Sequence, residues 1–248
     1  MNQILITKKL YITPELKRKK KIYKIEFLLS VFLVCILTSF YIYAEYDKGK
    51  SEATSQEILT NAQSVAPVDN TIAQSDVLVI VLDDAEQTEE INNKAETPVE
   101  VKKEIQQTPS GYNYATIATI KIPKIGVEYA ILDGQTDSVE ETEALLKMSP
   151  TKFWGPEPNE VGNFCIVGHN YRNSKFFSKV PTLVNGDIIE ITNLYTGETI
   201  SYSVYDKYEV VPEDTSCTTQ LTDGKKEITL ITCTNDNKYR VIVKAVAI

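Results

Sequence analysis

Histidine is almost absent from this chain of 248 residues: His169 is the single copy, and only four cysteines accompany it. A structural zinc site needs four Cys or His ligands. Cys165 and His169 lie four positions apart and could share one face of a strand, but Cys217 and Cys233 would both have to join them. The composition therefore disfavours a zinc protein, and it leaves one imidazole for any proton transfer.

Positive charge is lacking from most of the chain. Residues 1–24 hold eight Lys and Arg side chains against Glu15 alone, a local charge of +7, whereas the whole chain carries −8, so the remainder sums to −15. A surface that binds nucleic acid needs basic side chains for the phosphates. The charge distribution therefore excludes nucleic acid as a partner and points to a membrane.

Long apolar runs are rare as well, and the one that could cross a bilayer is residues 27–44, which carry no charge. Extended back to residue 22, it approaches the roughly 20 residues that span a hydrocarbon core. A signal peptide usually has about 7–15 apolar residues before a small-residue cleavage site, and no such site follows here. We predict an uncleaved transmembrane helix over 22–44.

The basic flank sets the orientation of that helix. Cytoplasmic ends of membrane helices carry an excess of Lys and Arg, so residues 1–21 are predicted to form a cytoplasmic tail. The rest of the chain then lies outside the cell. The predicted localisation is a single-pass protein of the cell membrane with an extracellular main domain.

Aromatic residues are missing from residues 47–110. The stretch is rich in Glu, Asp, Gln, Ser, Thr and Asn, which is typical of flexible linkers, and we predict an acidic extracellular stalk over 45–111. Residues 51–63 could form a short helix. The apolar island at 77–82 is too short to cross a bilayer and could be either a docking strand or an exposed patch.

From about Tyr112, runs of β-branched and aromatic residues alternate with Gly, Asn, Asp and Pro, which predicts strands. The predicted strands are 114–122, 127–132, 163–167, 187–192, 199–211, 227–232 and 240–248. Helices are predicted over 138–147, which has acidic residues in its first turn, and over 176–180. Short strands with little helix favour a closed barrel or a sandwich, so 112–248 is predicted to be one all-β domain.

Three residues with catalytic potential lie where a predicted strand meets a turn: His169, Cys233 and, seven residues later, Arg240. A thiolate kept ionised by an imidazole can attack a carbonyl, and a guanidinium can stabilise the resulting oxyanion. Each also has an ordinary interpretation, as a structural histidine, a buried thiol and a solvated arginine. Spacing alone does not exclude Arg172 or several lysines in place of Arg240.

At these residues the chain resembles the sortase family. The matching pieces are Ile122-Pro123-Lys124-Ile125-Gly126, Gly168-His169-Asn170, Thr229-Leu230-Ile231-Thr232-Cys233-Thr234 and Tyr239-Arg240-Val241. The resemblance covers roughly residues 112–248. The membrane helix and the stalk also suit a family that works on the outer face of Gram-positive bacteria.

The resemblance implies a closed eight-stranded β-barrel preceded by the membrane helix and stalk, and a cysteine transpeptidase. Cys233 would attack the Thr–Gly bond of an LPXTG-like sorting signal and form a thioacyl-enzyme. His169 would protonate the leaving amine and later deprotonate the incoming one. Arg240 would bind the substrate carbonyls and the oxyanion, and Thr232 would help to position the substrate. The implied partners are surface proteins with a C-terminal sorting signal and a cell-wall precursor or another amine.

The resemblance implies no cofactor. Some sortases bind calcium through acidic loop residues, which are more often simply solvated; the candidates here are Glu209, Glu213, Asp214 and Asp223. Only residues 212–227 lie between the predicted strand 199–211 and the strand that carries Cys233. This interval is too short for the insertion helix of the class that handles haem-related proteins. No long lid with an Asp-Pro-Trp signature is visible, which disfavours a pilin polymerase. A class A-, D- or E-like enzyme is expected.

Other interpretations remain. An anchored all-β domain could be a non-catalytic binding module, because a fold does not fix a function, and a thiol peptidase could use the same residues only to hydrolyse. The cysteines raise a related question, because an odd number outside the membrane leaves one unpaired. A Cys165–Cys217 disulfide would leave Cys233 free, whereas a Cys217–Cys233 disulfide would abolish catalysis.

Overall fold

The computed structural model describes residues 14–64, 104–136 and 138–248, and it divides into two compact units, Met1–Lys50 and Ser51–Ile248. Helix α1 (Pro14–Ser64) contributes residues to both units. The apolar island at 77–82 lies outside the described residues.

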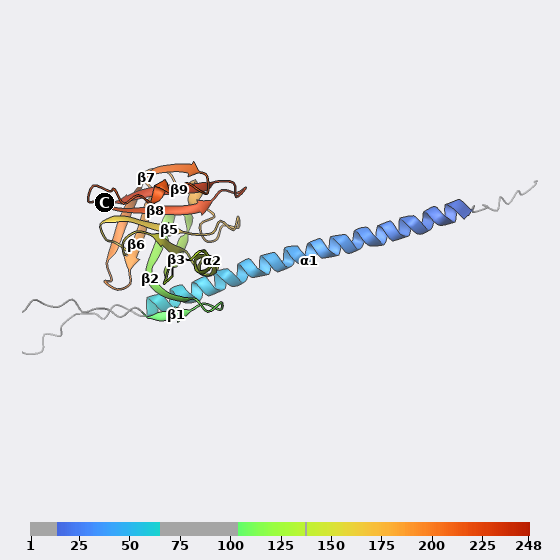
Figure 1. Ribbon diagram of the computed structural model, residues 1–248, viewed down its shortest axis with the longest axis horizontal. Helices are drawn as coiled ribbons and strands as arrows, with labels where there is room; N and C mark the ends of the chain where they lie inside the picture. Colours follow the sequence, from blue (N-terminus) through green and yellow to red (C-terminus); the bar gives the residue numbers. More distant parts are fainter. Residues whose placement is uncertain (1–13, 65–103, 137) are drawn as a thin grey trace, which may run out of the picture. The chain divides into compact units, whose positions relative to one another are not determined.

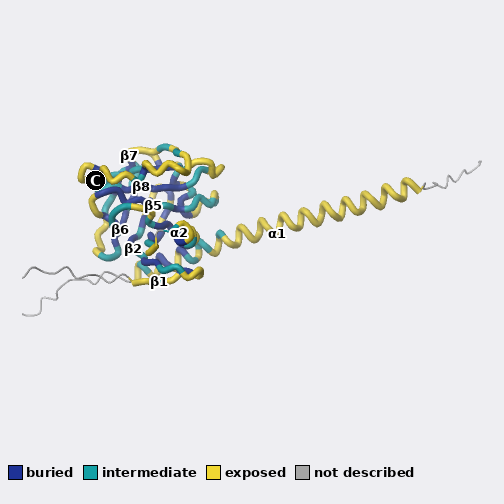
Figure 2. Tube along the Cα trace, in the orientation of Figure 1, coloured by how far each residue is buried: buried dark blue, intermediate teal, exposed yellow. Residues whose placement is uncertain are grey.

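The first unit contains residues 14–50 of α1. Proline suits the start of a helix, because the N–H that it lacks would have no partner there. The side chains of residues 14–47 are exposed, including the apolar run of residues 27–44 (Figure 2). Within the described part of the chain, α1 is the one helix long and apolar enough to cross a membrane. This agrees with the span predicted over 22–44, and the helix continues into the basic residues before it.

Eight strands of the second unit close into a barrel (Figure 1). They are β2 (Asn113–Ile122), β3 (Val127–Gly134), β4 (Thr151–Trp154), β5 (Gly162–Val167), β6 (Ile188–Asn193), β7 (Thr199–Val210), β8 (Lys226–Cys233) and β9 (Arg240–Ala247). Their order is β2-β3-β4-β5-β8-β9-β7-β6, and β6 pairs back with β2. The closed eight-stranded barrel is therefore confirmed. A short strand β1 (Ile105–Gln107) pairs with β2 outside the ring.

Two local predictions differ from the structure. Strand β4 was not predicted, because its four residues are too few to display a period. The helix predicted over 176–180 is wrong: Phe176 has a positive φ of 49°, a turn follows, and only a 3₁₀ helix forms at Val180–Thr182. Pro181 disfavours the helical conformation of the residue before it.

Helix α2 (Val139–Leu146) forms where a helix was predicted over 138–147. Ser138 caps its N-terminus, because its Oγ accepts a hydrogen bond from the N–H of Glu141 at 3.1 Å. The carboxylate of Glu141 is buried and accepts hydrogen bonds from the N–H groups of Gln135 and Thr136, at 3.1 and 2.8 Å. These bonds fix the turn that joins α2 to β3, and the helix packs against β3 and β4.

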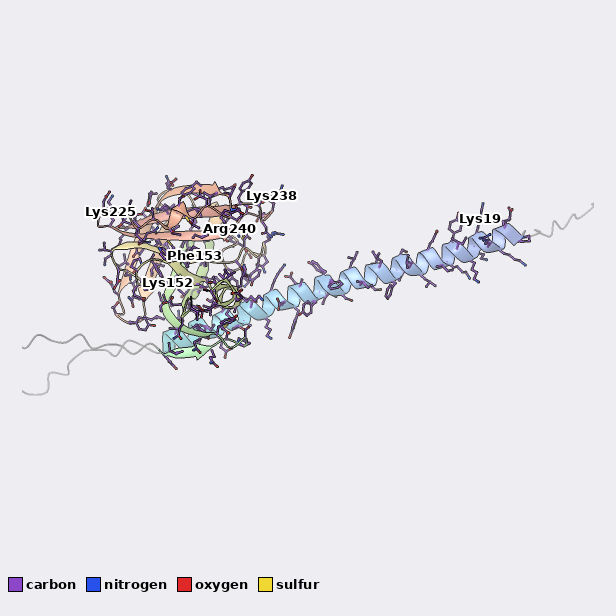
Figure 3. All side chains as sticks on the ribbon, viewed as in Figure 1. Lys19, Lys152, Phe153, Lys225, Lys238 and Arg240 are labelled. Atoms are coloured by element: carbon purple, nitrogen blue, oxygen red, sulfur yellow. The ribbon has the colours of Figure 1, made fainter. Side chains whose placement is uncertain are left out.

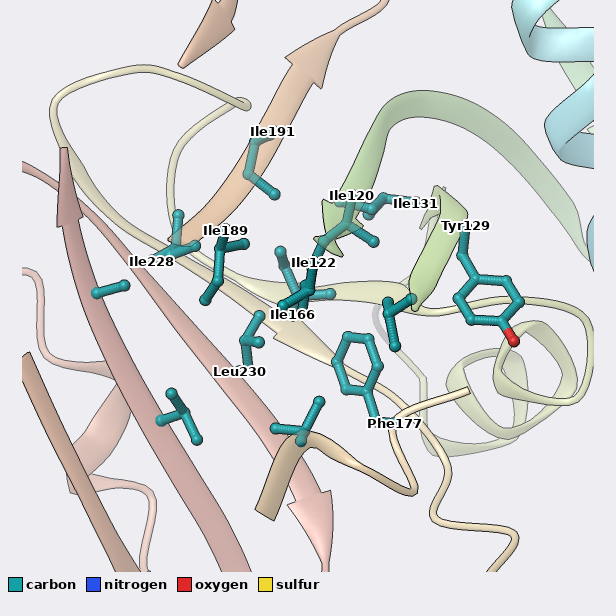
Figure 4. Packing of buried hydrophobic residues seen from close by; sticks show 14 of the residues in the cluster. Ile120, Ile122, Tyr129, Ile131, Ile166, Phe177, Ile189, Ile191, Ile228 and Leu230 are labelled. Atoms are coloured by element: carbon teal, nitrogen blue, oxygen red, sulfur yellow. The ribbon is translucent and has the colours of Figure 1, made fainter. Parts of the chain in front are cut away.

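The barrel interior is filled by branched aliphatic side chains from many strands (Figure 4). Ile120 of β2, Ile166 of β5 and Leu230 of β8 are all fully buried there. Burying such a side chain contributes about 1.5–3 kcal/mol. Several strands therefore share one rigid core, which holds their ends in fixed positions.

The last part of α1, residues 51–64, belongs to the barrel unit. Ile58 and Leu59 are buried, and Ile58 packs in a cluster with residues of β2, β3 and α2. Ser55 is also buried, and its Oγ lies 3.0 Å from Oγ of Ser149. The sequence predicted a linker over 45–111, with a possible short helix over 51–63. In the structure, α1 continues to Ser64 and β1 forms at Ile105–Gln107, so both ends of this range contain secondary structure.

Candidate active site

The parallel pairing of β5 with β8 determines where His169 lies. Val167 is the register partner of Ile231, so both strands end at the same edge of the sheet. His169 and Cys233 each follow two residues after that pair. The N–H of Gly168 extends the pairing with a 3.0 Å hydrogen bond to the carbonyl of Ile231. Two residues 64 positions apart are thus brought to one end of the barrel.

The antiparallel pairing of β8 with β9 determines where Arg240 lies. Cys233 and Arg240 are register partners at the last pair of this ladder. A compact turn joins them, closed by a 3.0 Å hydrogen bond from the N–H of Thr234 to the carbonyl of Tyr239. Nη1 of Arg240 donates a hydrogen bond to Sγ of Cys233 at 3.2 Å.

His169, Cys233 and Arg240 all line one pocket of about 300 Å³. Its apolar walls come from α2, from β4 and from the ends of β8 and β9; they include Val139, Leu146, Phe153, Ile231 and Ile242. Figure 3 labels Arg240 and Phe153 among the side chains of the barrel unit. All three polar residues are half-buried, so they are shielded but remain within reach of a ligand.

Thr232 has a contact that the sequence did not indicate. Its side chain is buried, and Oγ1 donates a hydrogen bond to the carbonyl of Gly168 at 2.8 Å. Thr232 also belongs to the pocket wall. Its hydroxyl therefore ties the residue before His169 to the residue before Cys233.

Asn170 makes the corresponding link on the other side of His169. Its Nδ2 donates to the carbonyl of Cys233 at 2.8 Å and to Oδ1 of Asn235 at 3.1 Å. Its Oδ1 accepts from the N–H of Arg172 at 3.0 Å. The sequence drew attention to Asn170 only as part of a motif. A short amide directly after a strand-end histidine is the signal that could have indicated this bridging role.

Gly168 is required by a close approach of an aromatic ring. A Cβ at this position would lie 2.6 Å from the ring of Phe177, which is fully buried. Because that ring is packed into the core, it has little room to retreat. Glycine before His169 thus allows the His169 strand end to approach the core closely.

Burial lowers the pKa of the His169 imidazole below its ordinary value, because desolvation disfavours the charged form. Glu143 opposes this effect and Lys147 adds to it. Two carboxylates, Glu143 and Asp214, line the same pocket as the guanidinium of Arg240. Burial is the larger effect, so the neutral form of the imidazole is favoured.

All four cysteines are free thiols in the structure. Cys165 and Cys217 are buried in one apolar cluster with Ile231 and Ile242. Burial raises the pKa of Cys165 to about 12, and it also raises the pKa of Cys217. Cys233 is the most accessible thiol of the barrel unit, which leaves it available as a nucleophile.

Candidate metal ligands can be compared in the parts of the chain that the structure describes. No group of three or more His, Cys, Asp or Glu side chains there is arranged to hold a metal ion. The loop carboxylates considered as calcium ligands are not gathered into such a group.

These three groups suit acyl transfer. A thiolate can attack a carbonyl carbon, an imidazole can move the proton of the leaving group, and a guanidinium can stabilise the negative oxygen of a tetrahedral intermediate. The strand ends that hold them belong to one closed barrel, which gives the site the rigid support that such chemistry needs.

Comparison with known proteins identifies similar domains. A family model described as Sortase domain matches residues 120–248, more than half of the chain. No curated protein matches the chain.

Solved structures also match. The sortase D5 transpeptidase of Clostridium perfringens is 36% identical, covering 54% of this chain and 79% of that chain, with a TM-score of 0.46. A lid mutant of sortase A from Corynebacterium diphtheriae is 29% identical, covering 56% and 74%, with a TM-score of 0.46. The pilus-related sortase C of Group B Streptococcus is 27% identical, covering 54% and 67%, with a TM-score of 0.46.

Proposed function

The chain belongs to the sortase family of cysteine transpeptidases, and on that premise we propose that Cys233, His169 and Arg240 form its catalytic centre. The observation that carries the proposal is the 3.2 Å hydrogen bond from Nη1 of Arg240 to Sγ of Cys233, in the pocket that His169 also lines. The two groups that handle negative charge are in contact, and the one imidazole of the chain lines the same pocket.

The first half of the reaction forms a thioacyl-enzyme. Sγ of Cys233 attacks the carbonyl carbon of the scissile peptide bond, and Arg240 stabilises the oxyanion. The C–N bond then breaks, and the leaving amine takes a proton from the imidazolium of His169. In the second half, an incoming amine attacks the thioester carbonyl and gives its proton to His169. The C–S bond then breaks, the new amide forms, and Cys233 leaves as the thiolate.

The lowered pKa of His169 has a consequence for this mechanism. Burial disfavours the imidazolium that donates this proton, so the protonated form has to be supplied from a population in which it is not the favoured one. Coupled titrations belong to the pair of groups and not to either residue.

The proposed donor substrate is a surface protein with an LPXTG-like sorting signal, cleaved between Thr and Gly. The largely apolar walls of the pocket, including Val139, Leu146 and Phe153, suit the aliphatic part of such a peptide. The proposed acceptor is an amine of the cell wall or its precursor. The apolar helix α1 supports anchoring in the cell membrane, with residues 1–21 in the cytoplasm and the barrel outside.

The test uses the full chain in detergent micelles with a library of LPXTG-like peptides. We expect cleavage, and a thioester adduct on Cys233 detected by intact mass, from the wild type but not from Cys233→Ala. No cleavage or adduct with any peptide, from a folded and reduced protein, would leave a non-catalytic binding module as the better interpretation.

Transfer is distinguished from hydrolysis in the same assay. Adding a glycine peptide or a diamine as acceptor should convert the product from the free acid to the amide. If the free acid remained the only product with every acceptor, the chain would be a thiol peptidase and the transpeptidase proposal would be wrong.

A further inference from the structure

Glu52, on the part of α1 that belongs to the barrel unit, is joined to Tyr129 of β3. The Tyr129 hydroxyl donates to the Glu52 carboxylate, with distances of 3.1 and 3.0 Å to its two oxygens. Nζ of Lys175 lies 3.4 Å from Oε1 of the same carboxylate. The half-buried Glu52 side chain thus contacts both β3 and the loop that follows His169.

Tyr129 in turn holds Phe176. Its hydroxyl oxygen accepts a hydrogen bond from the N–H of Phe176 at 2.9 Å. The two rings are stacked, with centroids 5.1 Å apart and planes at 21°. Phe176 has a φ of 49°, a conformation that costs free energy in a bulky residue and needs to be held by its surroundings. The Tyr129 oxygen and ring supply that support.

Phe176 is connected to His169 through its neighbours. The rings of Phe176 and Tyr171 meet edge to face, with centroids 5.0 Å apart and planes at 89°, and the Tyr171 ring lies 5.1 Å from that of His169. The backbone of Phe176 forms a bridge with Asn170, and the N–H of the next residue, Phe177, donates to the carbonyl of His169 at 3.1 Å. The loop is therefore closed on itself, with the imidazole at one end and Phe176 at the other.

We propose that Tyr129 is a positioning residue for His169, and that Glu52 holds Tyr129 in place from the end of α1. The inference rests on the proposed function, because it concerns the group that moves protons in that mechanism. Neither Glu52 nor Tyr129 lines the pocket, so both are assigned a positioning role through the loop that follows His169. The segment 51–64 is then a working part of the catalytic domain and not a spacer.

The single histidine makes the proposal directly measurable. In the full chain labelled with ¹³C-histidine, one imidazole signal reports the position and the titration of His169. The charged or titratable groups that line the same pocket are Glu143, Asp214, Cys217, Cys233 and Arg240; Lys147 follows α2, and the Tyr171 ring lies 5.1 Å from that of His169. None of them is altered in the variants below. A changed titration therefore reports a changed environment of the imidazole.

The variants are Glu52→Ala, Glu52→Gln and Tyr129→Phe. Glu52→Ala removes the acceptor for the Tyr129 hydroxyl, whereas Glu52→Gln keeps an amide oxygen that can accept. Tyr129→Phe keeps the stacked ring and removes the oxygen that holds Phe176. The matched controls are Glu57→Ala, an exposed glutamate of the same helix, and Tyr205→Phe, which loses a 3.0 Å hydrogen bond to Glu227 away from the pocket.

Glu52→Ala and Tyr129→Phe should lower kcat by about threefold to thirtyfold with little change in KM. They should also raise the titration midpoint of His169 towards its ordinary value, because a loosened loop exposes the imidazole. Glu52→Gln should restore most of the rate, and the two controls should match the wild type in both readouts.

Two results would overturn the inference. One is an unchanged His169 titration and kcat in both test variants. The other is a loss of activity that follows only the loss of folded protein in a thermal melt, with the His169 signal unmoved. The histidine signal can be read whether or not the chain transfers peptides, so a failure of the proposed function and a failure of this inference give different results.

Discussion

Arg240 donates a hydrogen bond from Nη1 to Sγ of Cys233 at 3.2 Å, and the two residues are register partners on neighbouring strands. The ladder between β8 and β9 fixes the two backbones, so only the side chain of Arg240 has to be ordered for the contact. A planar guanidinium can reach the thiolate and the oxyanion together, which a single ammonium cannot. This relationship supports the proposal that Arg240 is the clamp.

Arg240→Lys is expected to lower kcat/KM for peptide transfer by about 100-fold or more, because one preorganised donor to the oxyanion is lost. The measurement is steady-state cleavage of a sorting-signal peptide, together with circular dichroism to show that the barrel is intact. The matched control is Arg172→Lys, since Arg172 does not line the pocket. The reverse result, a loss of kcat/KM with Arg172→Lys and not with Arg240→Lys, would show that Arg172 and not Arg240 stabilises the oxyanion.

Thr232→Val is expected to cost about 1–3 kcal/mol of stability, because the buried carbonyl of Gly168 loses its side-chain hydrogen-bond donor. Transfer activity should also fall, since Gly168 precedes His169. Chemical denaturation and peptide cleavage measure the two effects. Thr232→Ser keeps the hydroxyl and should recover both; equal damage by both substitutions would show that the hydroxyl is not the important group.

Gly168→Ala is expected to destabilise the domain by about 1–3 kcal/mol through overpacking, because the added methyl group meets the ring of Phe177. Thermal unfolding measures this loss. Gly111→Ala is the comparison for a glycine with open space around it, although its φ of 87° adds backbone strain. A second change, Phe177→Leu, should relieve part of the Gly168→Ala defect; no relief would contradict the steric explanation.

His169 gives the stability a defined pH dependence. Its pKa is lowered in the folded chain, so below about pH 6.5 the unfolded chain binds more protons than the folded one. The stabilisation is therefore fully present above that pH and is lost as the pH falls towards the folded pKa. Urea unfolding between about pH 7 and pH 5 should show this loss in the wild type.

His169→Gln removes the only imidazole and should flatten the curve over the same interval, because carboxyl groups titrate mostly at lower pH. An equally steep loss in both proteins would assign the effect to other groups. The NMR titration of His169 provides a direct check, since its midpoint should lie below the ordinary value of about 6.5.

The thiols of the barrel unit should differ sharply in reactivity. Burial raises the pKa of Cys165 to about 12 and also raises that of Cys217, and the thiolate is the reactive form. Iodoacetamide at neutral pH, followed by peptide mapping, should modify Cys233 long before either of them. Thiol counts with and without reductant should agree; a difference of two thiols would reveal a Cys165–Cys217 disulfide.

Much of the barrel could be predicted from local sequence. The turns and the β-branched runs located β2, β3 and β5 to β9, and Ser138 with the acidic residues after it located α2. Strand β4 was missed because four residues give no period, and the helix predicted over 176–180 was wrong because Phe176 has a positive φ, which local sequence does not reveal.

By itself, the sequence indicated the apolar helix and the all-β character of the main domain, because composition and local periodicity need no knowledge of neighbours. It also singled out His169 as the one imidazole and Cys233 as a strand-end thiol, whereas the choice of Arg240 over other basic residues rested on the family resemblance. Only the tertiary structure decided that β5 and β8 run in parallel, which brings His169 to Cys233, and that Thr232 and Asn170 bracket the histidine. It also decided that Glu52 reaches Tyr129. Strand pairing and side-chain contacts join residues far apart in the chain, and local patterns carry no record of such partners.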